Sequence, residues 1–537
     1  MVSARRVSAL ALLVLMAAGF AAAAPIGRRA LLAQDDPHGP DVIPQLDNPN
    51  RTSVDVVVVG GGFAGLVAAR NLARQGIKVA VMEARATLGG RSDRNFMSTT
   101  NGTAIPCKGQ SCVDDKWWYD LGGQWTGPPA TQPRLMALAK EYGVKTYAAP
   151  QETGQYRFVL AGDTVDLPGE VLDDAKPTDE QKKRMTDAQI AALEEYQKAS
   201  DALYKIVTDK VKKYLDAPWT APDLEALDSI TFKSWVEDQT GNGDAQQLMF
   251  WLYAEAAGGY DPSSISVFEM ARLLATEIKG DSEAMLFYGA AAQFVGKLAD
   301  DITKNGGQIF TSTPARHIDQ QNGSVDVYSD DRVVTGKYVV VAVPPHLSGR
   351  ITYTPPLPGR RAQLTQRMPM GTTVKCLAFY DSPFWRKGAQ GGSVIALALK
   401  PGAAVSEVFD VSPPDGPGVL AGFLYNGAAL DLTEEGPEAV QKAVLEAWSE
   451  FLGDTNINNP INFVYVNWPE EQWAGGAYNA YASPGMWKSW GPSFFAPVGR
   501  IYWAGTDYAT SFLGFYEGAI QTAEAVANSL SGLLKSA

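Results

Sequence analysis

Three glycines near the start of the chain have the spacing of a turn that binds phosphate. They are Gly60, Gly62 and Gly65, in the pattern Gly-x-Gly-x-x-Gly. In such a turn the first glycine permits the sharp bend, the second lets the backbone approach a pyrophosphate, and the third lets a helix pack closely on a strand. Glu83 follows at the distance of an acid that accepts hydrogen bonds from ribose hydroxyls. These residues therefore predict a dinucleotide site.

Lys375 is a second candidate for chemistry because it interrupts the apolar pattern of residues 371–379. A lysine in a buried strand must be paired, or it must be functional with a lowered pKa. The alternative is a lysine at a strand edge whose ammonium group reaches solvent.

A strand–helix–strand unit must position the glycines. Residues 54–59 form a β-branched run that is typical of a strand buried on both faces. Residues 66–75 have helical spacing, residues 77–82 read as a second buried strand, and residues 337–345 as another. The pattern predicts a sheet of buried strands with the glycines at its first turn.

The length of the chain, 537 residues, exceeds what one hydrophobic core usually serves, so we expect two domains. The expected fold class is α/β with mixed α+β character, in which a Rossmann-like cofactor domain is assembled from three discontinuous segments and a substrate domain of sheet and helix is inserted. The chain is expected to begin with a signal peptide (1–24) and a propeptide or disordered arm (25–50). The cofactor domain would then comprise residues 51–131, 285–348 and 461–537, and the substrate domain a helical segment, 132–284, and a second segment, 349–460.

The first residues indicate export from the cytosol. Arg5 and Arg6 precede an apolar run over residues 9–24, which is the pattern of a secretory signal peptide and too short to favour a permanent membrane span. A twin-arginine signal and an organelle transit peptide stay open as alternatives. We expect an exported, soluble protein without stable membrane insertion. The net charge of -13 argues against nucleic acid as a partner.

Cysteines and glycosylation sequons fit an exported protein. Cys107 and Cys112 enclose four residues in a polar insertion and predict a local disulfide, whereas Cys376 reads as a buried thiol. Three cysteines and three histidines without ligand spacing predict no metal site. Sequons for N-glycosylation occur at Asn50, Asn101 and Asn322.

Five further motifs resemble the flavin-containing amine oxidase family, and most of all its monoamine and putrescine oxidase branch. The resemblance begins at Leu88-Gly-Gly-Arg91 and recurs along the chain after about residue 50. The other motifs are Tyr119-Asp-Leu-Gly-Gly-Gln-Trp-Thr-Gly-Pro128, Thr313-Pro-Ala315, Trp473-Ala-Gly-Gly-Ala-Tyr478, and Gly505-Thr-Asp507 followed by Gly514-Phe-Tyr-Glu-Gly-Ala519. L-amino-acid oxidases and polyamine oxidases are more distant members. The resemblance implies FAD as the cofactor.

The resemblance also implies which residues bind FAD. Asp507 would bond ribityl hydroxyls, and a helix that starts near Gly514 would aim its positive end at the flavin pyrimidine. The full expected set is Gly60, Gly62, Phe63, Ala64, Gly65, Glu83, Ala84, Arg91, Gly122, Gly123, Gln124, Trp125, Ala315, Trp473, Asp507, Gly514, Phe515 and Ala519.

For catalysis, the resemblance implies that Lys375 holds a water against flavin N5. Tyr478 and Phe515 match the two aromatic positions that flank the substrate nitrogen, where their π faces can orient an amine. Phe512 stands where a tryptophan is frequent and is a third candidate for a substrate contact.

Two departures from family patterns bear on how FAD is attached and on which class of substrate is expected. Ala477 stands where animal monoamine oxidases carry the cysteine that forms a thioether with the flavin, so FAD is expected to be non-covalent. L-amino-acid oxidases place an arginine for the substrate carboxylate in the segment around Trp125, and residues 119–128 contain no arginine. An amine is therefore favoured over an amino acid.

The expected function is an FAD-dependent oxidase that converts a primary or secondary amine to an imine, then to an aldehyde and ammonia, while O₂ is reduced to H₂O₂. The first alternative is an L-amino-acid or polyamine oxidase of the same superfamily, and the second is a flavin-binding module without catalysis. The expected partners are a small-molecule amine and O₂. A homodimer, which is common in the families that the chain resembles, stays open.

Overall fold

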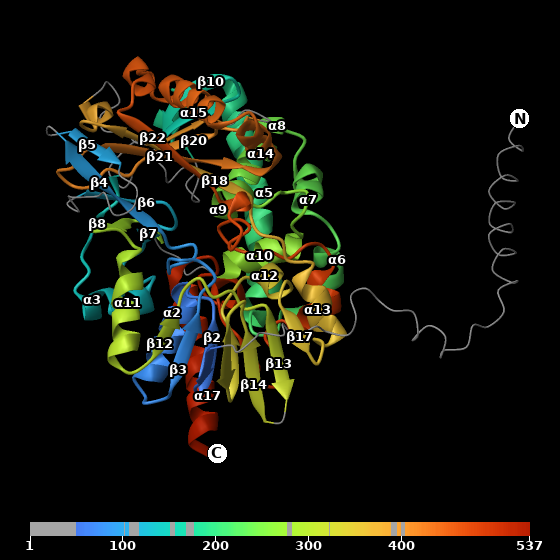
Figure 1. Ribbon diagram of the computed structural model, residues 1–537. Coiled ribbons are helices and arrows are strands. Elements are labelled where there is room, and N and C mark those ends of the chain that lie inside the picture. Colours follow the sequence, from blue (N-terminus) through green and yellow to red (C-terminus); the bar gives the residue numbers. More distant parts are fainter. Residues whose placement is uncertain are drawn as a thin grey trace, which may run out of the picture. The chain divides into compact units, whose positions relative to one another are not determined.

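The computed structural model describes residues 50–100, 103–106, 117–150, 156–167, 177–276, 282–321, 323–387, 395–398 and 403–536 (Figure 1). The chain divides into two compact units, Met1–Gln45 and Leu46–Ala537, and every described residue belongs to the second. The expected signal peptide, nearly all of the expected arm, the cysteine pair Cys107 and Cys112, and the sequons at Asn101 and Asn322 lie outside the described residues. Asn50, which we expected to close the arm, begins the first strand.

A five-stranded parallel sheet confirms the predicted Rossmann-like core. Its strand order is β12-β3-β2-β16-β23, and every neighbouring pair is parallel. The strands are β2 (Val56–Val59), β3 (Val79–Met82), β12 (Gln308–Phe310), β16 (Tyr338–Val341) and β23 (Ile501–Trp503). They come from three regions of the chain, as the discontinuous cofactor domain requires.

Two helices from opposite ends of the chain pack together beside this sheet. They are α2 (Phe63–Ala73) and α17 (Tyr516–Ser536), which lie side by side in Figure 1, the first in blue and the second in red. Helix α2 begins three residues before the predicted start at residue 66, because Gly62 already takes the N-cap position. Helix α11 (Gln293–Lys304) packs on α2 as well.

A second sheet has the order β1-β15-β14-β13-β17. Its strands are β1 (Asn50–Ser53), β13 (His317–Gln321), β14 (Ser324–Tyr328), β15 (Arg332–Gly336) and β17 (Thr352–Thr354).

A seven-stranded mixed sheet forms the framework of the substrate region, in the order β10-β9-β19-β20-β21-β18-β22. All eight residues of β18 are buried, between the antiparallel neighbours β21 and β22. The strands are β9 (Tyr156–Leu160), β10 (Asp163–Leu167), β18 (Thr373–Tyr380), β19 (Ile395–Ala398), β20 (Glu407–Asp410), β21 (Gly418–Tyr425) and β22 (Asn462–Asn467).

Two small three-stranded sheets flank the loop of residues 121–124. Their strand orders are β5-β4-β6 and β7-β11-β8. The strands are β4 (Arg94–Thr100), β5 (Thr103–Pro106), β6 (Trp117–Asp120), β7 (Trp125–Thr126), β8 (Thr146–Ala148) and β11 (Met285–Phe287). Because β6 ends at Asp120 and β7 begins at Trp125, the intervening loop is fixed at both ends.

Helices dominate the region between β7 and β11, which also contains β8, β9 and β10. Helix α5 begins with a capping box in which Thr186 and Gln189 exchange side-chain and backbone bonds. It continues into a π-helical segment, and a second π-helical segment follows α8; such segments often occur at functional sites. The elements are α3 (Pro133–Tyr142), α4 (Asp179–Lys182), α5 (Asp187–Ile206), η4 (Val207–Val211), α6 (Leu224–Asp228), α7 (Phe232–Gln239), α8 (Gly243–Phe250), η7 (Trp251–Glu255), α9 (Ala256–Gly258) and α10 (Val267–Thr276).

The other α-helices follow β16. They are α12 (Pro345–Ser348), α13 (Gly359–Thr365), α14 (Asn426–Glu434), α15 (Pro437–Leu452) and α16 (Met486–Trp490). Helix α15 packs on β9, β19 and β20 of the seven-stranded sheet. Among the described residues, none of the helices combines the length and the apolar character that a membrane crossing demands.

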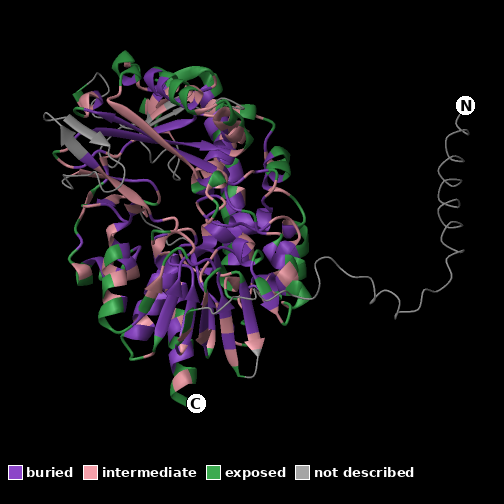
Figure 2. Ribbon diagram, viewed as in Figure 1, coloured by how far each residue is buried: buried purple, intermediate pink, exposed green. Residues whose placement is uncertain are grey.

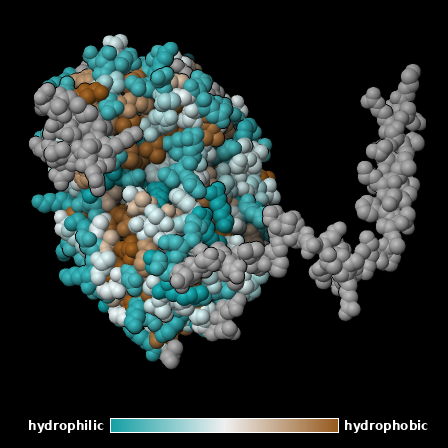
Figure 3. Space-filling view, in the orientation of Figure 1, coloured by the Kyte–Doolittle hydropathy of each residue, from teal (hydrophilic) through white to brown (hydrophobic). Residues whose placement is uncertain are grey.

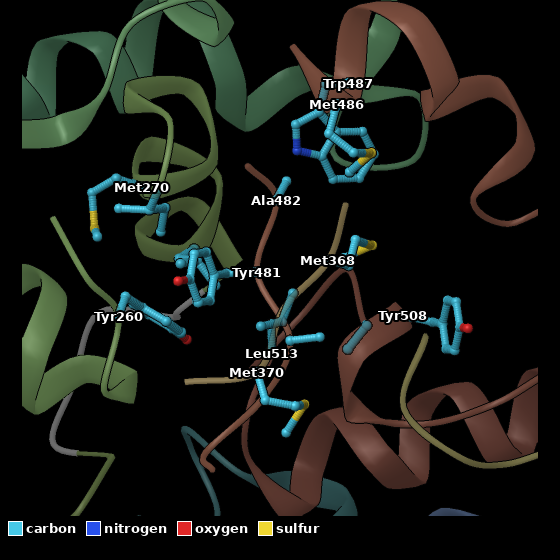
Figure 4. Close-up of a cluster of buried hydrophobic side chains, with 14 of the residues drawn as sticks. Tyr260, Met270, Met368, Met370, Tyr481, Ala482, Met486, Trp487, Tyr508 and Leu513 are labelled. Carbon is cyan, nitrogen blue, oxygen red and sulfur yellow. The ribbon is translucent and has the colours of Figure 1, made fainter. Parts of the chain in front are cut away.

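The hydrophobic core runs continuously from the parallel sheet into the helical region. Figure 2 shows the central strands as buried. A portion of the largest cluster appears in Figure 4, where the Tyr260 and Tyr481 rings meet edge to face at 5.1 Å. The face drawn in Figure 3 is mostly hydrophilic, with smaller hydrophobic groups between. One hydrophobic core therefore joins the helical region to the parallel sheet, whose first turn contains Gly60, Gly62 and Gly65.

Candidate active site

A large cavity of about 1150 Å³ brings the predicted site residues together. Its wall includes the turn between β2 and α2, the end of β3, the loop between β6 and β7, and side chains of β18, β20 and β21. Typical small-molecule pockets measure about 300–1,000 Å³, so this cavity has room for a dinucleotide and a further small molecule.

The glycine turn forms one end of the cavity. Gly62 is the N-cap of α2 and supplies no side-chain cap, so the first amide groups of the helix have no side-chain partner there. A Cβ placed on Gly62 would meet no atom closer than 3.9 Å, whereas one on Gly65 would lie 2.0 Å from the carbonyl oxygen of Gly60. Gly62 thus leaves space for a ligand, and Gly65 permits close contact between helix and strand.

Glu83 lies at the end of β3 beside this turn. Its carboxylate accepts hydrogen bonds from the backbone N–H of Gly61 at 2.6 Å and of Arg85 at 2.8 Å. Burial raises the pKa of Glu83, and these backbone donors oppose the rise. The side chain lines the cavity, where lone pairs can accept from ribose hydroxyls.

Asp507 is placed differently from the expectation. Its carboxylate accepts from Arg91 at 2.8 Å and from the backbone N–H of Ala480 at 2.7 Å, and it does not line the cavity. The pKa of Asp507 is lowered because Arg91 and these hydrogen bonds outweigh burial. Arg91 also donates to the carbonyl oxygen of Tyr478 at 2.6 Å. Asp507 therefore orients Arg91, which does line the cavity.

Lys375 is buried in the middle of β18, so the strand-edge alternative is wrong. Its ammonium group donates to the carbonyl oxygens of Asp120 at 2.8 Å and Gly122 at 2.9 Å, and to Oε1 of Gln124 at 2.6 Å. Burial lowers the pKa of Lys375, and the Asp120 carboxylate opposes this shift. The lysine thus lies in the cavity wall and fixes the loop between β6 and β7.

Aromatic side chains form the wall beside Lys375. Its ammonium nitrogen lies 5.7 Å from the Trp125 ring centroid and 5.8 Å from that of Phe423. Tyr478 contacts Phe423 edge to face at 5.7 Å between ring centroids. Phe515 lines the same cavity, so the two predicted aromatic positions do open on one space.

Phe512 lies outside that wall. Its side chain is fully buried and packs edge to face on Phe515 at 5.7 Å. It does not line the cavity, which contradicts the expected substrate contact. The ring instead supports Phe515 from behind.

A buried carboxylate in the cavity wall was missed by the sequence reasoning. Glu407 on β20 accepts from the Tyr425 hydroxyl at 2.7 Å and from the Trp251 ring N–H at 3.1 Å. Burial raises the pKa of Glu407 to about 8. The Tyr425 hydroxyl lies 3.5 Å from that of Tyr478, so the acid and the predicted aromatic wall are linked.

A sequence signal for Glu407 did exist. Glu407 and Asp410 interrupt an apolar run in the way that Lys375 interrupts its own strand. Asp410, however, is bound by Trp385, Arg386 and Ser412 and does not line the cavity. The pattern alone could not separate the acid in the site from the acid in the scaffold.

Most of the predicted site residues line the cavity. They are Gly60, Gly62, Phe63, Ala64, Glu83, Ala84, Arg91, Gly122, Gly123, Gln124, Trp125, Ala315, Lys375, Trp473, Tyr478, Gly514, Phe515 and Ala519. Gly65, Asp507 and Phe512 do not line the cavity. Each of them contacts a residue that does, namely Gly60, Arg91 and Phe515 respectively. Among the described residues, no group of three or more His, Cys, Asp or Glu side chains could hold a metal ion.

The profile of one protein family, described as flavin containing amine oxidoreductase, matches residues 63–531. The chain is 34% identical over 487 residues to an L-amino acid dehydrogenase of Synechocystis sp., covering 90% of this chain and 96% of that one. It is 31% identical over 481 residues to a probable flavin-containing monoamine oxidase A of Dictyostelium discoideum, covering 88% of this chain and 96% of that one.

Solved structures agree with these sequence relationships. Putrescine oxidase bound to putrescine superimposes with a TM-score of 0.76 at 25% identity, over 90% of this chain and 100% of that one. Cyclohexylamine oxidase from Brevibacterium oxydans has the same fold, with a TM-score of 0.77 at 24% identity, over 90% of this chain and 100% of that one.

Proposed function

Because this chain belongs to the family of flavin-containing amine oxidoreductases, we propose that it oxidises a primary diamine with O₂ as the electron acceptor. The chain is a flavin-containing amine oxidase whose cofactor is FAD. The proposal of a diamine substrate rests on one observation, the buried carboxylate of Glu407 in the cavity wall.

The residues of the glycine turn fit FAD. The uncapped start of α2 and the open space at Gly62 suit a pyrophosphate, and Glu83 suits a ribose. We propose that the cavity-lining residues of the predicted FAD set hold the cofactor, with Asp507 acting through Arg91. When bound, FAD supplies the two-electron acceptor that takes a hydride equivalent from the amine and passes the electrons to O₂.

FAD is bound non-covalently, since Ala477 offers no thiol for a thioether. Precipitating the holoenzyme with acid is therefore expected to release all of the yellow chromophore into the supernatant. Absorbance of the supernatant and of the redissolved pellet measures the partition. Flavin that stays with the precipitated protein would contradict the prediction.

The substrate amine is proposed to lie between the faces of Tyr478 and Phe515. Burial holds the pKa of Tyr478 well above its ordinary value, so its hydroxyl stays neutral. Two rings can orient an amine without withdrawing a proton from it, and the apolar surroundings exclude water from the reacting carbon.

Glu407 is proposed to bind a second ammonium group of the substrate. Glu407 is fully buried, and its oxygens face the hydroxyl of Tyr425 and the ring N–H of Trp251. An arriving cation would favour the ionised carboxylate and so oppose the effect of burial. An amino acid with an apolar side chain carries no second ammonium group for Glu407, so this contact favours diamines over such amino acids.

Lys375 is proposed to hold a proton at Nζ on the wall that faces the substrate and cofactor. From there it can orient a water for imine hydrolysis or assist the reduction of O₂. The imine hydrolyses to an aldehyde and ammonia, and we propose H₂O₂ as the second product.

An amine panel tests the proposal on the mature holoenzyme. Oxygen consumption and peroxide release would be measured with putrescine, benzylamine, tyramine and L-leucine, alongside reduction of an artificial acceptor dye under argon. Preferred turnover of putrescine with stoichiometric peroxide supports it. Turnover of L-leucine alone, with dye reduction and without peroxide, would instead favour an amino-acid dehydrogenase like the Synechocystis relative.

Export and assembly are separate proposals from the sequence. We propose that residues 1–24 are removed on export, that the Cys107–Cys112 disulfide forms, and that the sequons are glycosylated in a eukaryotic secretory route. Mass spectrometry of the mature protein tests all three, and light scattering tests the homodimer.

A further inference from the structure

A second, much smaller cavity lies beside Gln124, whose side chain accepts a hydrogen bond from Lys375. Its volume is about 20 Å³, close to what one water molecule requires. Its lining combines polar and apolar side chains, namely Trp118, Tyr119, Asp120, Gln124, Tyr147, Leu286, Phe287, Leu377, Val411 and Val419.

Buried polar atoms without a protein partner lie on residues of this lining. These atoms are Oδ1 of Asp120 and Nε2 of Gln124, and the hydroxyl oxygen of Tyr119, a third lining residue, is likewise buried without a partner. The other carboxylate oxygen of Asp120 accepts from the backbone N–H of Ala291 at 3.3 Å, and Oε1 of Gln124 accepts from Lys375 at 2.6 Å. One free acceptor and one free donor on the same water-sized cavity are the partners that a buried water needs.

Gln124 separates the two cavities. It lines the large cavity together with Lys375, and it lines the small cavity together with Asp120. The Lys375 ammonium group also donates to the backbone carbonyl of Asp120, so the lysine and the acid are fixed to the same loop. A chain of contacts therefore runs from Lys375 through the Gln124 amide to the small cavity and the Asp120 carboxylate.

We propose that one ordered water in the small cavity bridges Asp120 and Gln124, and that Asp120 is thereby a positioning residue that orients Lys375 and keeps it protonated. The inference rests on the proposed function, because the orientation of Lys375 matters only if the lysine acts in the oxidase reaction. Asp120 touches neither substrate nor cofactor, since it lies behind the loop and does not line the large cavity.

The charges around the pair are consistent with this role. Burial raises the pKa of Asp120, and the charges of Lys375 and Arg94 oppose the rise. Burial also raises the pKa values of the nearby phenols Tyr147 and Tyr516, so both stay neutral. When it is ionised, the Asp120 carboxylate opposes the loss of the Lys375 proton.

The first test is the pH dependence of the FAD absorption spectrum in the holoenzyme without amine. A charge in the cavity wall perturbs the spectrum of a bound chromophore, so the protonation of Lys375 has a readout that does not require turnover. Asp120→Asn is expected to move the spectral titration of Lys375 down by about one to two pH units, the effect of losing one nearby opposite charge.

A rescue variant separates positioning from simple damage. Gln124→Glu places a carboxylate where Oε1 now accepts from Lys375, so Asp120→Asn/Gln124→Glu is expected to return the titration to the wild-type pH or above. Asp228→Asn is the matched control, because Asp228 is a fully buried acid that contacts Ser266 and Lys488 and lines neither cavity. It is expected to leave the titration unchanged.

Several results would overturn the inference. They are a wild-type spectrum that does not change with pH, an Asp120→Asn titration equal to that of the wild type, and a double variant without rescue. If Asp120→Asn does not fold, a high-resolution crystal structure of the wild-type holoenzyme decides, and a water bonded to both Asp120 and Gln124 is expected. A failed amine panel would leave these results unaffected, so failure of the proposed function remains distinguishable.

Discussion

Replacing Lys375 with methionine is expected to lower kcat for amine oxidation about 100-fold, the usual contribution of a positioned proton donor or acceptor. Methionine has a similar length and no polar head, so it removes the ammonium group from the cavity wall without opening a large space. FAD is expected to stay bound, because the glycine turn and Glu83 make no hydrogen bond to Lys375 and keep their own contacts. Steady-state oxygen consumption measures kcat, and the visible spectrum measures FAD content.

Stability must be followed in the same variant. The carbonyl oxygens of Asp120 and Gly122 and the Gln124 side chain lose their common donor. A buried polar group left without its partner costs about 1–3 kcal/mol, so Tm should fall and activity should be assayed well below it. Lys488→Met is the control, since Lys488 is half exposed and pairs with Glu225. Undiminished turnover in Lys375→Met would remove Lys375 from the mechanism.

Replacing Glu407 with glutamine is expected to raise KM for putrescine about 10- to 100-fold and to change KM for benzylamine little. A hydrogen bond to a charged group contributes about 1.5–3 kcal/mol, which corresponds to this range. Glutamine keeps the shape and can still accept from Tyr425, but it carries no charge to bind a second ammonium group. The ratio of kcat/KM for the two amines is the measurement.

The pH profile gives an independent check on the same residue. The pKa of Glu407 is raised to about 8 by burial, so in the free wild-type enzyme the carboxylate is mostly neutral below that pH and ionised above it. The kcat/KM for putrescine should therefore rise as pH increases through this value, beyond the rise seen with benzylamine. Glu407→Gln should abolish the difference between the two profiles.

Glu255→Gln is the matched control for this pair of experiments. Glu255 also has a pKa raised by burial, but it pairs with Asn426 and does not line the cavity. It should leave the preference for putrescine intact, and because the Glu255 charge helps to raise the pKa of Glu407, that preference should develop at a lower pH. Equal selectivity in Glu407→Gln and the wild type would refute the second ammonium site and leave a monoamine oxidase.

Local sequence determined the phosphate end of the site. The turn at Gly60, the space at Gly62 and the packing at Gly65 depend on missing side chains within six residues, so their spacing could be interpreted without knowing the rest of the fold. The β-branched runs likewise predicted the buried strands β2, β3 and β16 of the parallel sheet. Domain boundaries within the chain stay a prediction.

The substrate end was only partly predictable, because its residues meet through long-range packing. The oddity of Lys375 in an apolar strand was visible in the sequence, but its three acceptors lie more than 250 residues away along the chain. Asp507 was recognised by its motif, yet its salt bridge to Arg91 is a tertiary contact that the motif does not reveal.

The sequence by itself therefore determined the family, the cofactor and the glycine turn, since motifs carry short-range backbone geometry. Only the tertiary structure decided that Glu407 opens on the cavity while Asp410 does not, and that Phe512 stands behind Phe515. Strand register and sheet partners set which face of β20 meets the cavity, and neither quantity is encoded by the residues of that strand alone.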